Sequence, residues 1–248
     1  MRALRILLII VVIVGGLFVI ADRVAVNFAE GKAADKLKSS EGLASTPDVS
    51  IKGFPFLTQV VGGSLDDVEI GIKDYEAKSG GESVHIADLK AEMHGVEFNS
   101  SYSSATADSA TGTALITYAE LLKSAKSEPV ELPLGATGKV IGLSDGGNGK
   151  IKVAVEVSRG GVKLPEPMYV TSTITVKGDT INAHADSIPK SLKVLGVSVP
   201  LPEGTARNVT DFSQKIDDLP AGIKLDKVEA VEDGVEITVK GSNLDLVG

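Results

Sequence analysis

Apolar and polar residues alternate along much of the chain after residue 48, and this alternation predicts β-strands with one apolar face. The clearest run has apolar side chains at alternate positions, which are Ile151, Val153, Val155 and Val157. Similar runs begin near residues 49, 68, 84, 170 and 235. Turn sequences such as residues 145–149 (DGGNG) separate them. We therefore expect successive hairpins in a mainly antiparallel sheet.

Three segments have the apolar spacing of helices. Residues 22–40 form the first. Thr117 and Glu120 form a capping box for a second helix, which is expected to end before Pro129. Residues 205–218 form the third, with an apolar face made of Val209, Phe212 and Ile216. Residues 99–112 are rich in Ser, Thr and Ala, and they are either a loop or a polar edge strand.

Strands thus outnumber helices, and the predicted fold class is α+β. We expect a strongly curved, mainly antiparallel sheet wrapped on helices that pack into its concave side. Such a sheet either closes over its own side chains or leaves a slot between sheet and helices. The alternation is compatible with both outcomes.

The N-terminal segment is apolar and flanked by charge. Ile6 to Ala21 carries no charged residue, with Arg2 and Arg5 before it and Asp22 after it. As a helix these residues span about 24 Å, against roughly 30 Å for a hydrocarbon core. The segment is either a signal anchor or a signal peptide cleaved after Ala21. In both cases the basic flank stays inside, so a single domain of residues 22–248 is expected outside the cytoplasm, at the plasma membrane or secreted.

Composition narrows the range of functions. The chain of 248 residues has no Cys, which rules out disulfides, thiol catalysis and a lipid-carrying cysteine. Its formal net charge of −8 argues against nucleic acid as a partner, because binding phosphate groups requires Lys and Arg patches. The fold must therefore be stabilised by burial of apolar side chains.

Candidate catalytic and metal-binding patterns do not have the context that they need. Residues 142–146 (GLSDG) match G-x-S-x-G, but a glycine-rich turn and a strand follow instead of a helix, which predicts a hairpin. The acidic pairs 66–67 and 217–218 are adjacent in sequence and read as surface charge. The spacing of His85, His94 and His184 fits no zinc site. We therefore predict no enzyme activity, no metal and no cofactor.

Residues 53–63 (GFPFLTQVVGG) predict a stiff apolar corner between two strands. Gly53 permits a sharp exit from the first strand, and Pro55 is suited to open a helical turn. Leu57, Val60 and Val61 then share one face of that turn. The corner either fills the core or forms a wall or rim of a slot for acyl chains.

GFPFLTQ (53–59), LPAGI (219–223) and EDGVEITVKG (232–241), in this order, carry a resemblance to a known family. From about residue 45 to 248 the chain resembles the LmeA-like family of actinobacterial envelope proteins, although residues 99–165 match only in general pattern. The resemblance implies binding of a phospholipid or another acyl-chain lipid, and a fold similar to the tubular lipid-binding superfamily.

We therefore expect an exported, membrane-proximal phospholipid-binding protein that shields acyl chains in an apolar slot and supports envelope lipid or lipoglycan metabolism. The alternatives are a non-catalytic envelope scaffold or interaction module with a filled core, and an enzyme acting on envelope glycans or lipids. The residues expected to line the slot are Phe54, Phe56, Leu57, Val60, Val61, Leu121, Leu122, Val209, Phe212 and Ile216.

Overall fold

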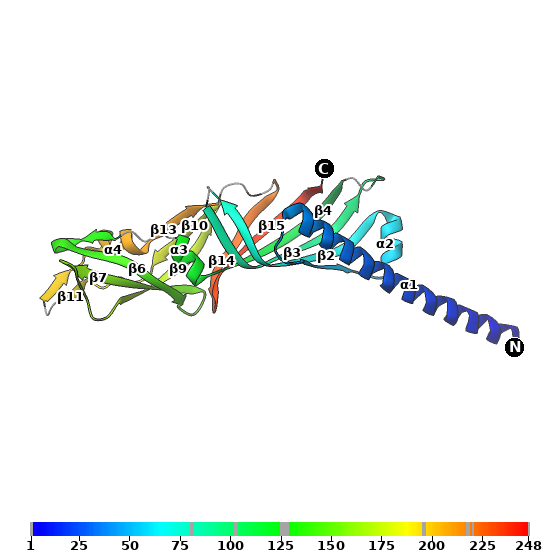
Figure 1. Ribbon diagram of the computed structural model, residues 1–248, viewed down its shortest axis with the longest axis horizontal. Helices are drawn as coiled ribbons and strands as arrows, with labels where there is room; N and C mark the ends of the chain where they lie inside the picture. The colour runs from blue at the N-terminus through cyan, green and yellow to red at the C-terminus, as the bar shows by residue number, and fades with distance from the viewer. Residues whose placement is uncertain are drawn as a thin grey trace.

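The computed structural model describes residues 2–79, 82–101, 104–124, 129–194, 197–216, 219 and 221–247. Figure 1 shows an elongated molecule, in which two curled sheets follow one another and a long helix extends from one end. The acidic pair 217–218 lies outside the described residues, as do residues 125–128, which precede Pro129.

Sheet A has six strands and is built from both ends of the chain. Its strands, in spatial order, are β1 (Asp48–Lys52), β2 (Ser64–Ser79), β3 (Glu82–Phe98), β4 (Ala105–Thr117), β15 (Gly234–Val247) and β14 (Ile223–Val231). The chain leaves this sheet after β4, builds the second sheet and returns as β14 and β15. Because β15 pairs with β4, the two ends of the chain hold sheet A together.

Sheet B has seven strands and is formed by the middle of the chain. Its path, in spatial order, is β13 (Phe212–Lys215), β10 (Thr180–Ala185), β9 (Met168–Lys177), β7 (Lys150–Arg159), β6 (Ala136–Asp145) and β5 (Val130–Leu132), and β8 (Val162–Lys163) pairs with β7. A separate hairpin joins β11 (Ser191–Val194) to β12 (Val197–Pro200). Neighbouring strands in all three sheets are antiparallel.

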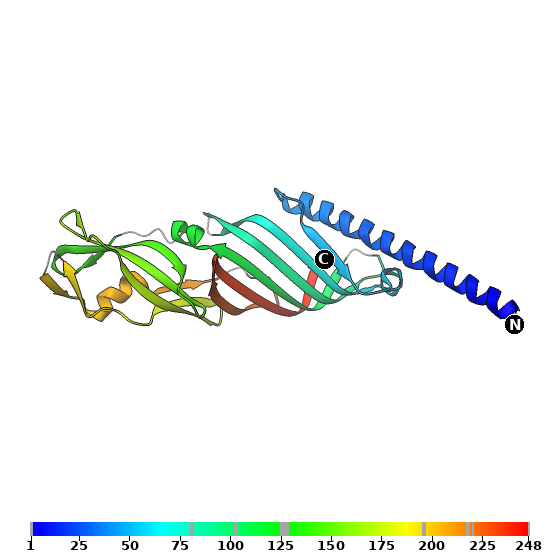
Figure 2. The ribbon, with the colours of Figure 1, turned by 90° about the horizontal axis from the view of Figure 1, so that it is seen from below.

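Helices lie at the edges and on the open sides of the curled sheets (Figure 2). α4 (Glu203–Thr210) contacts β10 and also β5 and β6, near the two opposite edges of sheet B, so it crosses the open side of that sheet. α2 (Phe56–Gly62) and part of α1 (Arg2–Glu41) pack on one end of sheet A, and α3 (Tyr118–Ser124) follows β4 at the junction of the sheets. A 3₁₀ turn, Pro133–Gly135, follows β5. The predicted α+β fold with a strongly curved antiparallel sheet is confirmed, with two sheets rather than one.

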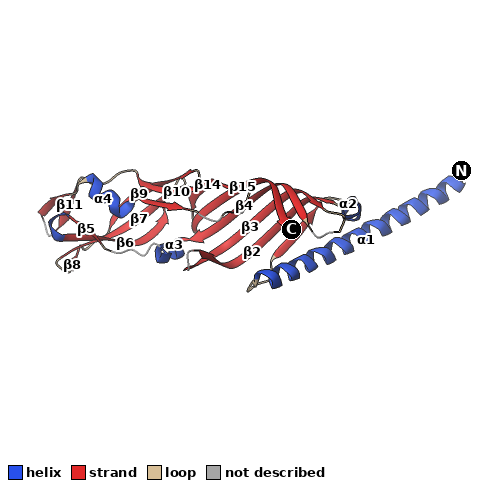
Figure 3. Ribbon diagram, turned by 90° about the horizontal axis from the view of Figure 1, so that it is seen from above, coloured by secondary structure: helices blue, strands red, loops and turns tan. Residues whose placement is uncertain are grey.

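α1 is one continuous helix of 40 residues. Its first half projects from the body with its apolar side chains exposed, and it is long and apolar enough to cross a membrane (Figure 3). Its second half, predicted as a helix over 22–40, continues the apolar segment without a break and runs along β1. The division of the chain into residues 1–21 and a single domain 22–248 stays a prediction.

Two predictions of secondary structure are wrong. Of residues 99–112, expected to be a loop or an edge strand, residues 105–112 belong to β4, which is a central strand because it pairs with β3 on one side and with β15 on the other. The helix expected over 205–218 ends at Thr210. Asp211 is extended, and its carboxylate accepts the N–H of Ala185 at 2.9 Å, which turns the chain into the edge strand β13.

Two other local predictions are confirmed. The hydroxyl of Thr117 accepts the N–H of Glu120 at 3.3 Å and caps α3, which is one half of the predicted capping box; the carboxylate of Glu120 accepts the N–H of His85. Residues 142–146 lie at the end of β6 and in the hairpin to β7, where the N–H of Gly146 donates to the carbonyl of Lys150 at 2.8 Å. This serine therefore sits on a hairpin and not before a helix.

Candidate functional site

The apolar face of sheet A is continuous across all six strands. Residues directly opposite each other in neighbouring strands share a face. The registers link Val49 to Ile70, Ile70 to Ala91, Ala91 to Gly112 and Gly112 to Val239. We call this face the trough, and its residues are Val49, Ile51, Val68, Ile70, Ile72, Leu89, Ala91, Met93, Ala110, Gly112, Ala114, Val235, Ile237, Val239, Ile223, Leu225 and Val228.

The opposite face of sheet A is polar. Its residues alternate with those of the trough and include Glu69, Lys73, Lys90, Glu92, Thr111, Thr113, Glu236, Thr238 and Lys240. Lys52 and Glu69 form an ion pair across β1 and β2 at 3.0 Å, and Lys240 pairs with Asp226 at 3.0 Å. An antiparallel sheet of this kind has one face for water and one for apolar contacts.

The protein's own side chains cover the trough at its two ends. At the α2 end, Phe56 and Val26 form a cluster with Leu65, Val96 and Ala107, against which Val68 and Met93 pack. At the other end, Val228 and Val235 belong to the core of sheet B. Each cluster thus takes in residues of the trough or packs against them.

The middle of the trough is left partly open. Ile70, Ile72, Leu89, Ala91 and Val239 are half-buried, and within the described part of the chain they belong to neither cluster. Apolar side chains on a sheet face are normally removed from water by a second layer. This strip is therefore an apolar surface without a complete cover.

In β3 and β4, the middle of the trough is lined by residues with small side chains. They are Ala91, Ala110, Gly112 and Ala114. A Cβ atom added at Gly112 would lie 2.9 Å from a methyl group of Val239 on the neighbouring strand, so the curl brings these strands close together on this face. Glycine in a strand interior is typical of such a close approach.

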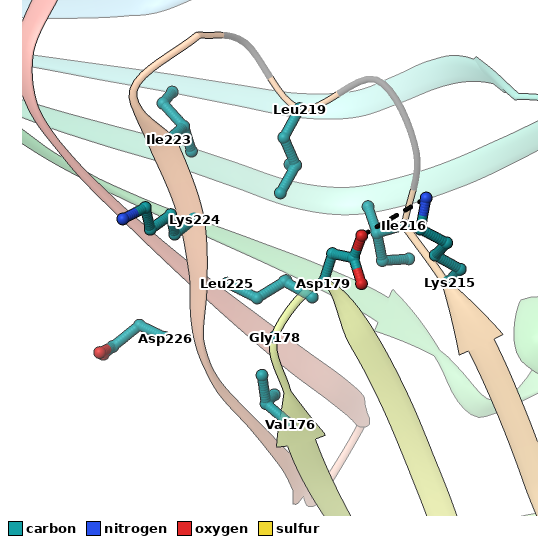
Figure 4. Close-up of a pocket in the computed structure, with 10 residues that line it drawn as sticks. All are labelled: Val176, Gly178, Asp179, Lys215, Ile216, Leu219, Ile223, Lys224, Leu225 and Asp226. Atoms are coloured by element: carbon teal, nitrogen blue, oxygen red, sulfur yellow. Dashed lines mark ion pairs between the residues drawn. The ribbon is translucent and has the colours of Figure 1, made fainter.

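A groove of about 760 Å³ lies where the trough meets sheet B. Figure 4 shows Leu225 of β14 and Leu219 directed into it, while Lys224 points to the other side of the strand. Val176 and Ile216 supply further apolar wall. Because Ile223 and Leu225 belong to both trough and groove, the two form one apolar surface. The volume of the groove is within the range of about 300–1,000 Å³ that small-molecule sites occupy.

Polar groups at the junction of the sheets are paired. The Nζ of Lys215 lies 3.4 Å from a carboxylate oxygen of Asp179 at the edge of the groove. A hydrogen bond from the Thr180 hydroxyl, together with the charge of Lys215, lowers the pKa of Asp179. The phenol of Tyr118 donates to the carbonyl of Val231 at 2.8 Å, and burial, with the charge of Asp145 adding to it, raises the pKa of Tyr118 to about 12. The first pair ties β13 to the turn between β9 and β10, and the second ties the start of α3 to the end of β14.

The α2 corner is locked to α1 by a buried carboxylate. Asp22 has no exposed surface, and its Oδ1 accepts the N–H of Leu57 at 2.8 Å, in the first turn of α2. Its other oxygen lies 2.6 Å from Arg23, whose guanidinium stacks 5.2 Å from the centre of the Phe54 ring. Gly53 has φ +90°, the Phe54–Pro55 bond is cis, and Gly63 ends α2 in the left-handed region. Helix α2 thus sits where the sequence predicted a corner.

The structure separates the residues that the sequence nominated for a slot. Phe56 is buried, Leu57 and Val60 pack against it, and Phe54 and Val61 are exposed outside the corner. Leu121 and Val209 pack against the core of sheet B, and Leu122 is half-buried on α3. Phe212 is exposed on β13, and Ile216 lines the groove.

Most of the trough was not nominated. Its residues were recognised in the sequence as alternating strand positions, but alternation is equally typical of a filled core. The small residues of β4 were the available signal, because Ala and Gly at alternate positions of a central strand leave volume that neighbouring side chains do not fill. That signal can be interpreted only when β4 is known to be a central strand of the sheet.

Charged and titratable side chains gather on outer surfaces. The hydrogen bond to Asp67 raises the pKa of His94, and His184 lies 2.7 Å from Asp211. Among the described residues, no group of three or more His, Asp or Glu side chains could hold a metal ion. The arrangement that the trough presents is suited to apolar contact with a long, flexible ligand.

Comparison with known proteins gives one result. The sequence model of a family described as LmeA-like phospholipid-binding matches residues 20–240. Among curated proteins nothing matches the chain, and among solved structures nothing matches it either. The matched range begins just before Asp22 and contains both sheets except the last residues of β15. The chain therefore belongs to the LmeA-like phospholipid-binding family.

Proposed function

We propose that this chain is an exported, membrane-anchored protein that binds a phospholipid by holding its acyl chains in the trough of sheet A. The observation that supports this most directly is the half-buried strip between the two apolar clusters. Each methylene moved from water onto that strip would contribute roughly 0.8 kcal/mol, so a tail of ordinary length supplies ample affinity without covalent chemistry.

The groove at the sheet junction supports the same proposal. Its wall continues the trough through Ile223 and Leu225. An acyl chain lying across β3, β4 and β15 would reach the groove without leaving apolar surface. In this arrangement the protein acts by binding and presenting lipid, and it would support envelope lipid or lipoglycan metabolism by keeping a lipid available outside the bilayer.

The location follows from α1. Its apolar half is exposed on all sides, and basic residues precede it. We infer a single span with the body outside the cytoplasm. The anchor is favoured over a signal cleaved after Ala21, because the helix runs unbroken through that site and cleavage would leave Asp22, which holds the α2 corner, at a free N-terminus. Retention of the full-length mass in carbonate-washed membranes tests this directly.

The binding proposal is tested by filling the trough. Ala91→Phe would place a ring in the middle of the strip, and Lys90→Phe, one residue earlier on β3, would place the same ring on the polar face. The full chain is purified from membranes in mild detergent. Co-purified lipid is measured by native mass spectrometry, and exchange of labelled phospholipid is measured between vesicles.

The expected result is a lipid-loaded wild type, a loaded Lys90→Phe variant and an Ala91→Phe variant that has lost its lipid and its exchange. A lipid-free wild type with no exchange would overturn the proposal. Equal loading of the two Phe variants would show that lipid binds somewhere other than the trough.

A further inference from the structure

The body carries exposed apolar side chains where α1 leaves it. On α1, Val24 is 63% exposed and Phe28 is 67% exposed, and on the α2 corner Phe54 is 58% and Val61 is 87% exposed. These four residues are called the rim. They belong to the end of sheet A from which α1 projects, as Figures 1 and 3 show for α2 and α1.

The rim lies at a defined height along α1. The contact between Asp22 and the Leu57 N–H holds the first turn of α2 beside the residue that directly follows the apolar segment 6–21. At 1.5 Å per residue, Val24 is about 3 Å and Phe28 about 9 Å farther along the helix than Asp22. The interfacial layer outside the hydrocarbon core is roughly 5–7 Å thick on each side. The α2 corner therefore falls at the level of lipid headgroups if the apolar segment spans the bilayer.

The chemistry of the rim suits that level. Residues 53–65 contain no ionisable side chain. Two carboxylates lie against the corner: Asp22 is buried and bonded inside it, whereas Asp66 is exposed beside Gly53, with its N–H donated to the side chain of Gln59. Cations accompany both aromatic residues, with Arg23 5.2 Å from the Phe54 ring and Lys32 5.6 Å from the Phe28 ring. Arg and Lys side chains beside aromatic rings are favoured at a membrane interface. There the apolar stem and the ring contact hydrocarbon while the charged end stays in water.

We propose that the rim inserts into the interfacial layer of the leaflet from which α1 emerges, so that the protein holds the bilayer by two elements, α1 and the α2 corner. This inference rests on the anchoring part of the proposed function. It goes beyond that function because it names a second lipid-contacting surface. The corner closes one end of the trough, so insertion keeps that end of sheet A against the lipid surface.

The test uses the absence of native cysteine. Single-cysteine variants of the full chain are labelled with an environment-sensitive fluorophore at three exposed valines: Val12 in the apolar segment, Val61 in the rim and Val162 on β8 of sheet B, which is 55% exposed. Val162 is the matched control, because it is an exposed valine at the opposite end of the molecule (Figure 3). Each variant is reconstituted into phosphatidylcholine–phosphatidylglycerol vesicles with and without spin-labelled lipid.

The expected result is quenching and a blue shift at positions 12 and 61, and neither at 162. Quenching at 12 without quenching at 61 would overturn the inserted rim and leave the anchor and the trough in place. Absence of quenching at both 12 and 61 would overturn the anchor and the rim together.

Crosslinking separates a protein partner from the bilayer. The rim proposal predicts that unlabelled Val61→Cys stays monomeric under mild oxidation in vesicles. Efficient disulfide dimers at position 61 without quenching would assign the rim to a second copy of the chain and overturn its assignment to lipid.

Discussion

Sheets A and B have the same alternating sequence pattern, but the protein fills one of them and leaves the other partly open. In sheet B, Val155 and Val157 have almost no exposed surface, and Leu121, Leu201 and Val209 pack over that face from outside the sheet. In sheet A the equivalent positions of β2 and β3 remain half-buried. The difference lies in what covers the sheet, since none of the helices in the described part of the chain covers the middle of sheet A in the way that α4 covers sheet B.

The first prediction compares the same substitution in the two sheets. Ile151→Ala in the core of sheet B should lower the free energy of unfolding by about 2–5 kcal/mol, because the buried side chain leaves a cavity. Ile70→Ala in the trough should lower it by less, because the Ile70 side chain keeps part of its surface exposed to water. Urea unfolding of the full chain in mild detergent, followed by circular dichroism, measures both.

The effects of the two substitutions on the amount of bound lipid should be in the opposite order. Ile70→Ala should reduce bound lipid while Ile151→Ala leaves it unchanged in the folded fraction. Equal losses of stability with equal lipid loading would mean that the trough is packed like sheet B, and the comparison would fail.

The second prediction concerns the corner that closes the trough. Asp22→Ala leaves the Leu57 N–H without its acceptor and should cost about 1–3 kcal/mol locally. Hydrogen exchange at residues 56–60 should accelerate while sheet B is unaffected. Asp35→Ala is the matched control, an exposed acid on the same helix. Unchanged protection of the Leu57 amide would show that packing of Phe56 alone holds the corner.

The third prediction concerns a buried hydroxyl group in the core of sheet B. The hydroxyl of Ser172 is buried and has no hydrogen-bond partner among the described residues. Ser172→Ala should therefore be neutral or stabilise the fold by up to about 1 kcal/mol, because an unsatisfied polar group is removed. Ser158→Ala is the comparison: its hydroxyl lies 2.8 Å from that of Thr137, so the substitution should destabilise by about 1 kcal/mol. A clear loss of stability in Ser172→Ala would contradict this view of the core.

The smallest expected effect is a pH dependence of opposite sign in the two sheets. In sheet A, the hydrogen bond to Asp67 raises the pKa of His94 above 6.5, so its contribution to stability is present below pH 6.5 and is lost as the pH rises through the folded value. In sheet B, hydrogen bonds from Thr173 and then Lys150 lower the pKa of Asp186 below 3.8. That contribution is present above pH 3.8 and is lost as the pH falls through the folded value.

Hydrogen exchange at pH 8 and at pH 3, each compared with pH 5, separates the two effects. Protection around β2 and β3 should fall at the higher pH, and protection around β7 and β9 should fall at the lower. His94→Gln and Asp186→Asn should each remove one of these changes. Loss of protection in both sheets at the same pH would contradict the assignment of these effects to His94 and Asp186.

The sequence was sufficient for part of the local structure and for the family. The alternation at residues 151–157 became β7, the capping box at Thr117 became the start of α3, and residues 53–63 became the corner. These features depend on neighbours within a few residues, so they are visible in a short stretch of sequence. GFPFLTQ, LPAGI and EDGVEITVKG indicated the family that the match over residues 20–240 established.

The features that failed depend on contacts between distant segments. Phe212 has the spacing of a helix face, but the bond between Asp211 and Ala185 draws it into an edge strand. The Ser- and Ala-rich segment became a central strand only because β15, more than 100 residues later, pairs with it. The contrast between a filled and an open inner face depends in the same way on where α4 lies, which local periodicity does not encode.

The unbroken course of α1 limits how far the body can travel. The helix is about 60 Å long at 1.5 Å per residue, and its second half is fastened to sheet A by the carboxylates of Asp22 and Glu30, which accept the N–H groups of Leu57 and Ile51. A body on a disordered tether could swing through the space outside the cell membrane and meet partners at many distances. If α1 is retained as the membrane anchor that we propose, this body is held on a rigid helix, and an acceptor of the proposed lipid would have to come within one molecular length of the bilayer.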